Sequence, residues 1–230
     1  MDPVQDPRVT RIAVFYDGNY LSRVSDYYRY QHPRQRRLSF DGIHAFIRAE
    51  AAVREQVEER TCQIVEAHWF RGRLLTPTLQ ERYPDDQDRL RRMTGERSFQ
   101  DIVVSTGIVQ HEYPVAIEEG TGRSYEKGID VWLSLEAYDL AVHKRFDVLA
   151  LVACDGDYVP LVRKLNGIGT RVMLLEWDFS YEVTQGGVSR THVTKTSQNL
   201  IDECSYVLPM HQIIDQPNPD QARRVESLFV

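Results

Sequence analysis

The sequence predicts an α/β fold in which helices cover both faces of a central, mainly parallel sheet. Two apolar runs, at residues 11–16 and 148–153, have the length and composition of buried strands, and an acidic turn follows each of them. Strands that alternate with helices along a chain build parallel sheets covered on both faces. The 230 residues, of which 42% are hydrophobic and 27% charged, suit one soluble domain of this class.

The first strand is followed by an arginine-rich stretch, residues 20–37. The pattern predicts helices over 41–58 and 77–93 and strands over 61–71 and 101–115. In the first of these helices the apolar side chains are Ile43, Phe46, Ile47, Val53 and Val57. Ser39 or Asp41 can cap this helix, and Gly107 marks a turn that can divide the 101–115 segment into two strands. Residues 118–122 are expected to form a loop.

The most regular helix is predicted over residues 127–143. Its apolar residues recur at steps of three and four on one side: Ile129, Leu133, Ala137, Leu140 and Ala141. Farther along, a helix begins at Tyr158 and stops at the glycines of 167–169, and a strand follows over 171–176. This second half therefore repeats the alternation of helix and strand that predicts the parallel sheet.

One domain is expected over residues 11–208, between an N-terminal tail at 1–10 and a C-terminal tail at 209–230. Residues 186–187 mark a turn, and the chain is expected to become loose from 217–220. No apolar run approaches the roughly 18 residues of a membrane span, and the polar, acidic N-terminus lacks the pattern of a signal peptide. These features predict a cytoplasmic protein without a membrane partner.

Several site classes are not supported by the sequence. The three cysteines, Cys62, Cys154 and Cys204, form no C-x-x-C pair and indicate free thiols in a reducing compartment. The histidines lack zinc-ligand spacing, and neither a phosphate-binding glycine motif nor a nucleophile elbow occurs. Acidic neighbours should keep Cys154 protonated. The formal charge of −6 argues weakly against a general nucleic-acid binder, although acidic metal ligands would themselves contribute to it.

Four aspartates are the strongest candidates for chemistry. Asp17 follows the first strand, Asp155 and Asp157 follow the strand at 148–153, and Asp130 lies at the start of the 127–143 helix. Open α/β sheets bind their ligands where strands end. Each carboxylate alone could simply cap a helix or form a turn. Together they would repel one another unless a cation neutralises them, and Mg²⁺ and Mn²⁺ prefer such oxygen ligands.

Two further acidic residues of the 127–143 helix are poorly placed to join Asp130. Helical geometry puts Glu136 about 120° and Asp139 about 180° away from it around the axis. Glu136 is therefore interpreted as a supporting or substrate-side group, and Asp139 as solvated surface.

Candidate groups for binding phosphate are basic. Lys127, just before Asp130, could neutralise a carboxylate or hold a phosphate. Residues 20–37 interleave arginines with tyrosines, and Arg34, Arg36 and Arg37 are the candidates there for contacts with single-stranded nucleic acid. A solvated loop with an incidental charge run is about as compatible with that stretch.

Three blocks of sequence together resemble the NYN domain family, in its LabA-like branch, within the PIN-like nuclease superfamily. They are Phe15-Tyr16-Asp17-Gly18-Asn19, Lys127-Gly128-Ile129-Asp130 and Ala153-Cys154-Asp155-Gly156-Asp157-Tyr158. The resemblance covers roughly residues 11–207. It implies a Rossmann-like α/β/α sandwich and an acidic Mg²⁺ or Mn²⁺ pocket that cleaves RNA phosphodiesters.

Transferred position by position, the resemblance makes the metal-binding and catalytic residues Asp17, Asp130, Asp155 and Asp157, and the substrate-binding residues Asn19 and Lys127. The chain departs from the branch at two places. Glu136 stands where an aspartate is usual, and Ala153-Cys154 stands where Ser-Gly is usual.

The sequence is compatible with two functions and disfavours a third. The first is a metal-dependent ribonuclease, and the second is a regulatory RNA-binding or protein-interaction module that cleaves little. The third, a phosphatase of the haloacid-dehalogenase type, is disfavoured because Asn19 occupies the position of its second aspartate. A homo-oligomer is compatible with the first two. The sequence leaves open the RNA target, endo- or exonucleolytic action, the number of metal ions and the oligomeric state.

Overall fold

The computed structural model describes residues 8–75, 78–80, 83–117, 124–125, 127–185 and 188–230, and the predicted α/β fold is confirmed. Its centre is a six-stranded parallel sheet with the order β10-β7-β6-β1-β2-β3. The strands are β1 (Thr10–Asp17), β2 (Cys62–Arg73), β3 (Val109–Pro114), β6 (Val148–Val152), β7 (Arg171–Glu176) and β10 (Tyr206–Pro209).

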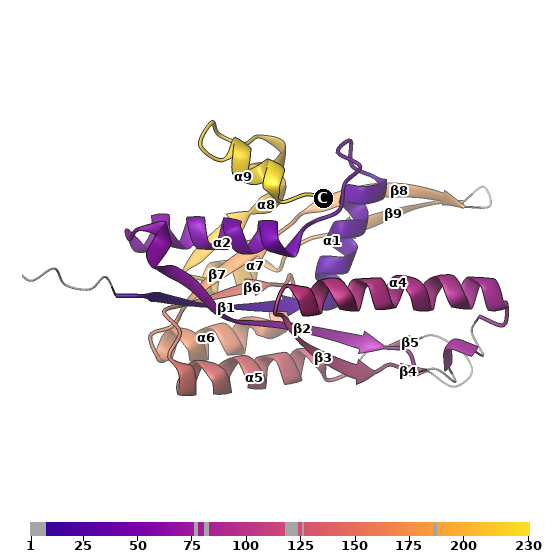
Figure 1. Ribbon diagram of the computed structural model, residues 1–230, viewed down its shortest axis with the longest axis horizontal. Coiled ribbons are helices and arrows are strands. Elements are labelled where there is room, and N and C mark those ends of the chain that lie inside the picture. Colours follow the sequence, from indigo (N-terminus) through magenta and orange to yellow (C-terminus); the bar gives the residue numbers. More distant parts are fainter. Residues whose placement is uncertain (1–7, 76–77, 81–82, 118–123, 126, 186–187) are drawn as a thin grey trace, which may run out of the picture.

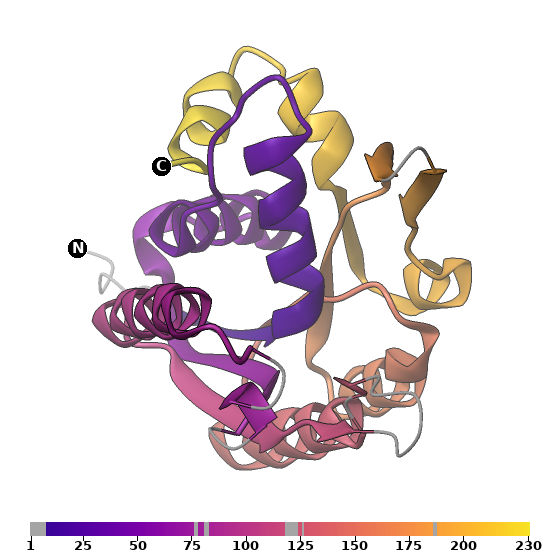
Figure 2. The ribbon, with the colours of Figure 1, turned by 90° about the vertical axis from the view of Figure 1, so that its right-hand side faces the viewer.

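Helices cover both faces of this sheet, so the molecule has three layers (Figures 1 and 2). One side carries α1 (Gly18–Tyr30), α2 (Phe40–Glu55), α4 (Asp86–Ser105), α8 (Met210–Asp215) and α9 (Ala222–Ser227). The other side carries α5 (Ile129–Lys144), α6 (Val159–Gly167) and α7 (Gln198–Glu203). Within the described residues, no helix is both long and apolar enough to cross a bilayer.

Strand β1 is apolar along its length because both of its faces are buried. Ile12, Val14 and Tyr16 are buried in the core on the α1–α2 side. Ala13 and Phe15 point the opposite way, into the core under α5 and α6. Because successive strand residues face opposite sides, a central strand covered on both faces needs apolar residues at every position.

The strand order creates one switch point in the sheet. From β1 the chain adds β2 and β3 on one side, and then β6, β7 and β10 on the other. The crevice outside the carboxyl ends of β1 and β6 is therefore the position where open α/β sheets bind ligands. Figure 2 looks onto this carboxyl edge.

Most of the predicted elements are confirmed within a few residues. The helix predicted over 77–93 is displaced, because α4 spans Asp86–Ser105, and the segment 101–115 is not one continuous strand. Helix α4 continues through Ser105, Gly107 follows with a φ of +72°, and only β3 is extended. Val103 is buried, whereas its neighbours Ile102 and Val104 are exposed. One buried position per turn suits a helix, so packing overrode the strand preference of the branched side chains.

Helix α2 begins as predicted but is shorter. The Ser39 hydroxyl, not Asp41, accepts the capping hydrogen bond from the amide of Gly42 at 3.2 Å. The helix ends at Glu55, because Gln56 adopts a left-handed conformation. The interpretation of Val53 and Val57 as part of the apolar stripe was wrong: these side chains are 62% and 38% exposed.

The C-terminal segment 209–230 is packed and not loose. It forms α8 and α9, and its Val225, Leu228 and Phe229 are buried in the core beside α2. Gly42 allows this contact, since a Cβ atom there would collide with the carbonyl oxygen of Ser227. The N-terminal tail expected at residues 1–10 falls largely on residues 1–7, outside the described residues, as does the loop expected at 118–122.

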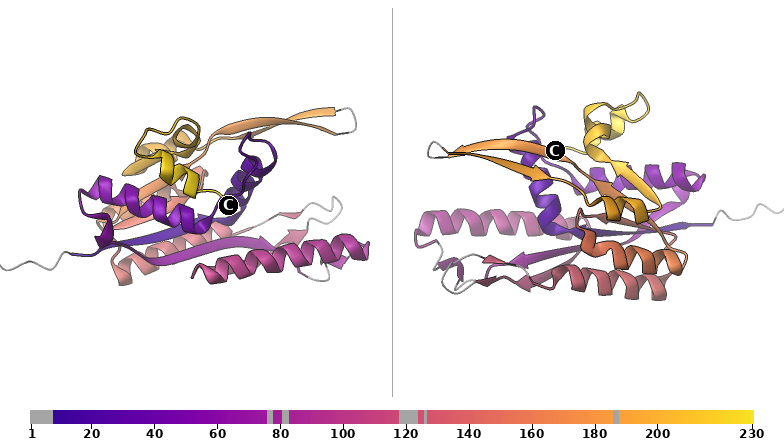
Figure 3. Two further views of the ribbon diagram at one scale, coloured as in Figure 1. Left: turned by 45° about the horizontal axis from the view of Figure 1, so that its top comes forward. Right: turned by 180° about the vertical axis from the view of Figure 1, so that it is seen from behind.

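Two hairpins leave the sheet at its carboxyl edge. The small one pairs β4 (Ala116–Ile117) with β5 (Ser124–Tyr125). The larger pairs β8 (Phe179–Gln185) with β9 (Val188–Thr194) and projects as a long arm beyond the body (Figure 3). The sequence had indicated only the turn at 186–187 of this arm, which lies outside the described residues.

Candidate functional site

The acidic residues gather at the switch point of the sheet. Asp17 is the last residue of β1, and Asp155 lies just beyond β6. These two strands are hydrogen-bonded neighbours, with Tyr16 in register with Val152. The two aspartates therefore lie at the same edge, as the sequence predicts.

Asp17 also caps a helix. Its Oδ1 accepts a hydrogen bond from the amide of Tyr20 at 3.0 Å, at the start of α1. The next residue, Gly18, is needed for packing, because a Cβ atom there would lie 2.6 Å from the carbonyl oxygen of Phe70 and 2.7 Å from the Trp69 ring. Both the capping role and the close approach of α1 to β2 hold the Asp17 carboxylate in place.

Asp155 and Asp157 belong to a short 3₁₀ turn, η2 (Gly156–Tyr158), between β6 and α6. The Asp155 Oδ1 accepts a hydrogen bond from the amide of Asp157 at 3.0 Å. Both side chains are exposed, whereas Tyr158 at the end of the turn is buried. The turn thus presents two carboxylates to solvent and buries a tyrosine behind them.

Tyr158 connects this turn to Asp130. Its hydroxyl donates a hydrogen bond to Oδ1 of Asp130, in the first turn of α5, at 2.9 Å. Burial raises the pKa of Tyr158 far above its ordinary value, and the charges of Asp17, Asp130 and Asp155 raise it further. The charges of three of the four predicted carboxylates therefore act on one protonated hydroxyl, which contacts Asp130 directly.

The donor chemistry of this edge fits a hard divalent cation, but a complete set of ligands is not preassembled. In the part of the chain that the structure describes, no three His, Cys, Asp or Glu side chains lie close enough to hold one metal ion together. Mg²⁺ usually retains several waters and requires only one or two carboxylates from the protein. The carboxylates present therefore suit a largely hydrated ion better than a dry four-aspartate cage.

Cys154 lies beside this site and remains a thiol. Burial raises its pKa to about 11, and the charges of Asp17 and Asp155 contribute to that increase. The sequence-based expectation that acidic neighbours disfavour a thiolate is confirmed, so Cys154 is not a nucleophile at neutral pH.

Two acidic residues at the same edge were missed. Glu176 is the last residue of β7, and Asp178 follows it. Glu176 is 95% buried, and burial, followed by the charge of Asp178, raises its pKa to about 7. Thr196 ties them together: its amide donates to Asp178 Oδ1 at 2.8 Å and its hydroxyl to Glu176 Oε2 at 3.4 Å. The signal was available, because the predicted strand at 171–176 ends on a carboxylate.

The predicted phosphate-binding residues occupy different surroundings. Asn19, in the first turn of α1, is half-buried and lines a pocket of about 670 Å³. Lys127 is exposed just before α5, with Gly128 between it and the helix. Both lie near the aspartates along the chain.

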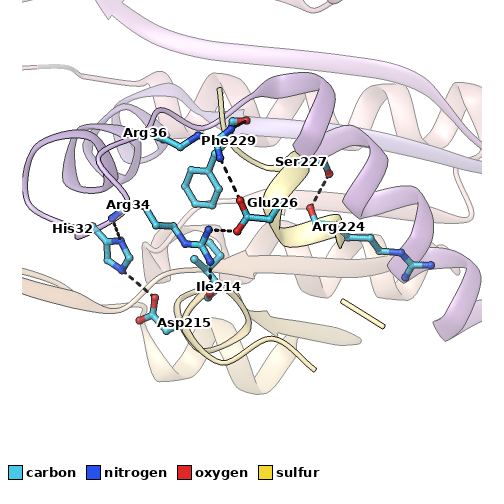
Figure 4. Close-up of polar contacts among 9 residues, drawn as sticks. All are labelled: His32, Arg34, Arg36, Ile214, Asp215, Arg224, Glu226, Ser227 and Phe229. Atoms are coloured by element: carbon cyan, nitrogen blue, oxygen red, sulfur yellow. Dashed lines mark hydrogen bonds and ion pairs between the residues drawn. The ribbon is translucent and has the colours of Figure 1, made fainter. Parts of the chain in front are cut away.

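The arginine-rich stretch is elsewhere and holds the C-terminal segment (Figure 4). The Arg34 guanidinium donates to Glu226 at 2.5 Å and to the carbonyl of Ile214 at 3.1 Å. Arg36 donates to the carbonyl of Phe229 at 2.8 Å and lies 3.3 Å from Glu226. Arg37 pairs with Val230 through two backbone hydrogen bonds of 3.2 and 2.9 Å.

These arginines are also remote from the acidic edge. Helix α1 leads away from Asp17 and ends at Tyr30, before Arg34, Arg36 and Arg37. Its 13 residues span about 20 Å. Arg34, Arg36 and Arg37 therefore form a structural junction between the segment after α1 and the C-terminal segment.

The two other acidic residues of α5 point elsewhere. Glu136 is half-buried and acts electrostatically on His68 of β2, partly opposing the decrease that burial causes in the pKa of that histidine. Asp139 is exposed and lies 3.4 Å from His143 on the same helix. The interpretation of Asp139 as surface is confirmed.

Comparison with known proteins identifies one family. The profile of the NYN domain matches residues 11–211, which includes all of the central sheet except Thr10, the first residue of β1. No curated protein matches the chain.

One solved structure shares the fold, and a second has a weaker similarity. A protein of unknown function from Vibrio parahaemolyticus has a TM-score of 0.50 and 17% sequence identity, over 90% of this chain and 96% of that one. MurG from Acinetobacter baumannii has a TM-score of 0.29 and 13% identity, over 74% of this chain and 35% of that one. The first shows a shared fold, and the second is too dissimilar to support an argument.

Proposed function

The chain belongs to the NYN domain family, and we propose that it is a metal-dependent ribonuclease whose site is the acidic edge of the sheet. In the PIN-like NYN family, the role inferred for the members is a nuclease that uses divalent metals, and RNA is the substrate class to which the family points. The observation that carries the proposal is that Asp17 and Asp155 lie at the ends of neighbouring strands, at the switch point of a parallel sheet, and that the Tyr158 hydroxyl ties Asp130 to the same turn.

The proposed site would hold Mg²⁺ or Mn²⁺ through Asp17, Asp130, Asp155 and Asp157. A bound ion would lower the pKa of a water and offset the charge that develops on the phosphate. The protein's own contribution is orientation. Hydrogen bonds fix three of these carboxylates before a substrate arrives, at Tyr20, Tyr158 and the amide of Asp157. Such preorganisation avoids a reorganisation cost during the reaction.

Two polar residues flank the proposed metal ligands. Asn19 follows Asp17 by two residues, and Lys127 precedes Asp130 by three. An amide and an ammonium group at these positions can donate hydrogen bonds to phosphate oxygens. We assign the binding of the phosphate next to the cleaved bond to them.

A second function has one observation in its favour. The absence of a compact three-ligand group among the described residues is what a regulatory RNA-binding or protein-interaction module would show. Such a module would retain the fold and bind its partner without metal-dependent turnover.

Cleavage of single-stranded RNA in Mn²⁺, with binding measured separately in EDTA, separates the two functions. Asp17→Asn and Asp155→Asn should each reduce cleavage by about 100-fold or more, because each 1.4 kcal/mol of lost transition-state stabilisation is tenfold in rate. RNA binding should be unchanged or tighter. Asp139→Asn, an exposed change on α5, is the matched control. Equal cleavage by the purified wild type and Asp155→Asn would refute the ribonuclease.

A further inference from the structure

A basic pocket opens beside the acidic edge, between α4 and the carboxyl ends of β2 and β3. It has a volume of about 670 Å³, within the range of roughly 300–1,000 Å³ typical of ligand sites. We call it the α4 pocket. Its polar lining includes Asn19, Arg71, Arg73, Tyr83, Arg92 and Arg97.

The α4 pocket adjoins the aspartates through two neighbouring strands. Asp17 is in register with Phe70 of β2, so Arg71 lies one residue beyond the level of Asp17. Asn19 lines the pocket and is separated from Asp17 by Gly18 alone. A strand of nucleic acid that passes over the acidic edge would therefore reach this pocket with its adjacent nucleotide.

The charge of the lining opposes that of the molecule. Four arginines and one glutamate, Glu96, give the lining a formal charge of +4 − 1 = +3, whereas the whole chain carries −6. A concave basic surface of this kind concentrates anions. In a protein that is otherwise acidic, it offsets the repulsion of phosphate by the carboxylates next to it.

Two of the arginines form ion pairs with glutamates of the protein, and the other two form none with the described residues. Arg71 lies 3.2 Å from Glu96, and Arg73 lies 2.8 Å from Glu112. Arg92 and Arg97 are exposed on α4 and form no ion pair with any described residue. They are therefore the groups that can bind phosphate without breaking an ion pair.

The pocket also contains a flat aromatic surface. The Arg92 guanidinium lies 4.0 Å from the centre of the Tyr83 ring, and Arg89 donates to the carbonyl of Tyr83 at 3.0 Å. Leu74 and Met93 add apolar lining. A tyrosine ring and a guanidinium plane with cations nearby are the combination on which single-stranded bases stack and phosphates pair.

We propose that the α4 pocket binds the nucleotide of a single-stranded RNA next to the phosphate that lies at the acidic edge. Arg92 and Arg97 hold its backbone, and Tyr83 stacks with its base. This inference rests on the proposed function in so far as it takes RNA as the substrate, but it does not require cleavage.

The test measures binding without turnover. A fluorescent single-stranded RNA of about 12 nucleotides is titrated in EDTA at several salt concentrations. For Arg92→Ala with Arg97→Ala, we expect affinity to fall at least tenfold and the slope of log K against log salt to fall by about 1.4, because each phosphate contact on a single strand contributes about 0.7. Tyr83→Leu should weaken binding and leave the slope unchanged, because it removes stacking and no charge.

The matched control removes the same charge outside the pocket. Arg91→Ala with Arg223→Ala changes two exposed arginines, one on α4 beside Arg92 and one on α9, and should bind as the wild type does. Equal affinity and slope in the pocket variant and this control would overturn the inference. A wild type that shows pocket-dependent binding but no metal-dependent cleavage would support the inference and refute only the ribonuclease.

Discussion

The hydroxyl of Tyr158 donates a hydrogen bond of 2.9 Å to Oδ1 of Asp130, and this contact joins the turn after β6 to the first turn of α5. The two residues are 28 positions apart in the chain. Tyr158 is fully buried, and the nearby charges of Asp17, Asp130 and Asp155 favour its protonated form. The hydroxyl therefore acts as a permanent donor that orients one carboxylate of the candidate site.

Tyr158→Phe tests this contact. The substitution preserves the ring and removes the donor, so we expect the free energy of unfolding to fall by about 1.5–3 kcal/mol, the range for a hydrogen bond to a charged group. Urea denaturation measures the change. Tyr138→Phe, on the half-buried side of α5, is the control and should cost less. Equal stability of Tyr158→Phe and the wild type would show that the contact does not form in solution.

Metal binding should stabilise the folded protein. At a concentration about 100 times its Kd, Mn²⁺ would add about 2.7 kcal/mol and raise the Tm by about 5–10 °C. Asp157→Asn should reduce this increase and leave the Tm without metal unchanged, since the Asp157 side chain is exposed. Asp139→Asn, farther along α5, should respond as the wild type does. A melting curve that millimolar Mn²⁺ leaves unchanged would count against the proposed metal site.

The arginine junction predicts loss of stability when it is removed. Arg34→Ala with Arg36→Ala deletes the contacts with Glu226, Ile214 and Phe229 that hold α8 and α9. We expect the free energy of unfolding to fall by about 1–3 kcal/mol. Limited proteolysis should cut the C-terminal segment sooner.

RNA binding distinguishes this structural role from the substrate role that the sequence suggested. If the two arginines have only a structural role, RNA binding by the Arg34→Ala, Arg36→Ala variant should depend on salt as that of the wild type does. A slope lower by about 1.4, with unchanged stability, would assign both arginines to phosphate contacts instead.

The parts of the fold that the sequence predicts well are those in which local pattern and burial agree. Strand β6 is apolar at every position because it is covered on both faces, and α5 buries Ile129, Leu133 and Ala137 at regular helical steps. The carboxylates Asp17 and Asp155 could be placed for the same reason, since each lies at or just beyond the end of such a strand.

The parts that were missed depend on contacts between distant residues. Arg34 acquires its partner Glu226 from 192 positions away, and no local pattern indicates that pairing. Segment 101–105 has strand-like composition but is helical because only Val103 meets the core. The α4 pocket likewise combines β2, α4 and α1, so its basic lining is visible only once these elements are assembled.

His44 of α2 predicts how stability depends on pH. Its ring centre lies 6.1 Å from that of Tyr16, and its Nε2 is buried without a hydrogen-bond partner among the described residues. Burial lowers its pKa from 6.5 to about 4, an effect that Asp41 partly opposes. The folded state therefore binds this proton less readily than the unfolded chain, and stability falls as the pH falls from about 6.5 towards 4.

His44→Phe removes this proton linkage and retains a ring of similar shape. Between pH 7.5 and pH 5, the wild type should lose about 1–2 kcal/mol more of its unfolding free energy than the variant, because the unfolded wild type gains a proton over that range. Urea denaturation at the two pH values measures this difference, and the other titrating groups cancel because both proteins contain them. The same loss in both proteins would show that His44 is already protonated, or solvated, in the folded state.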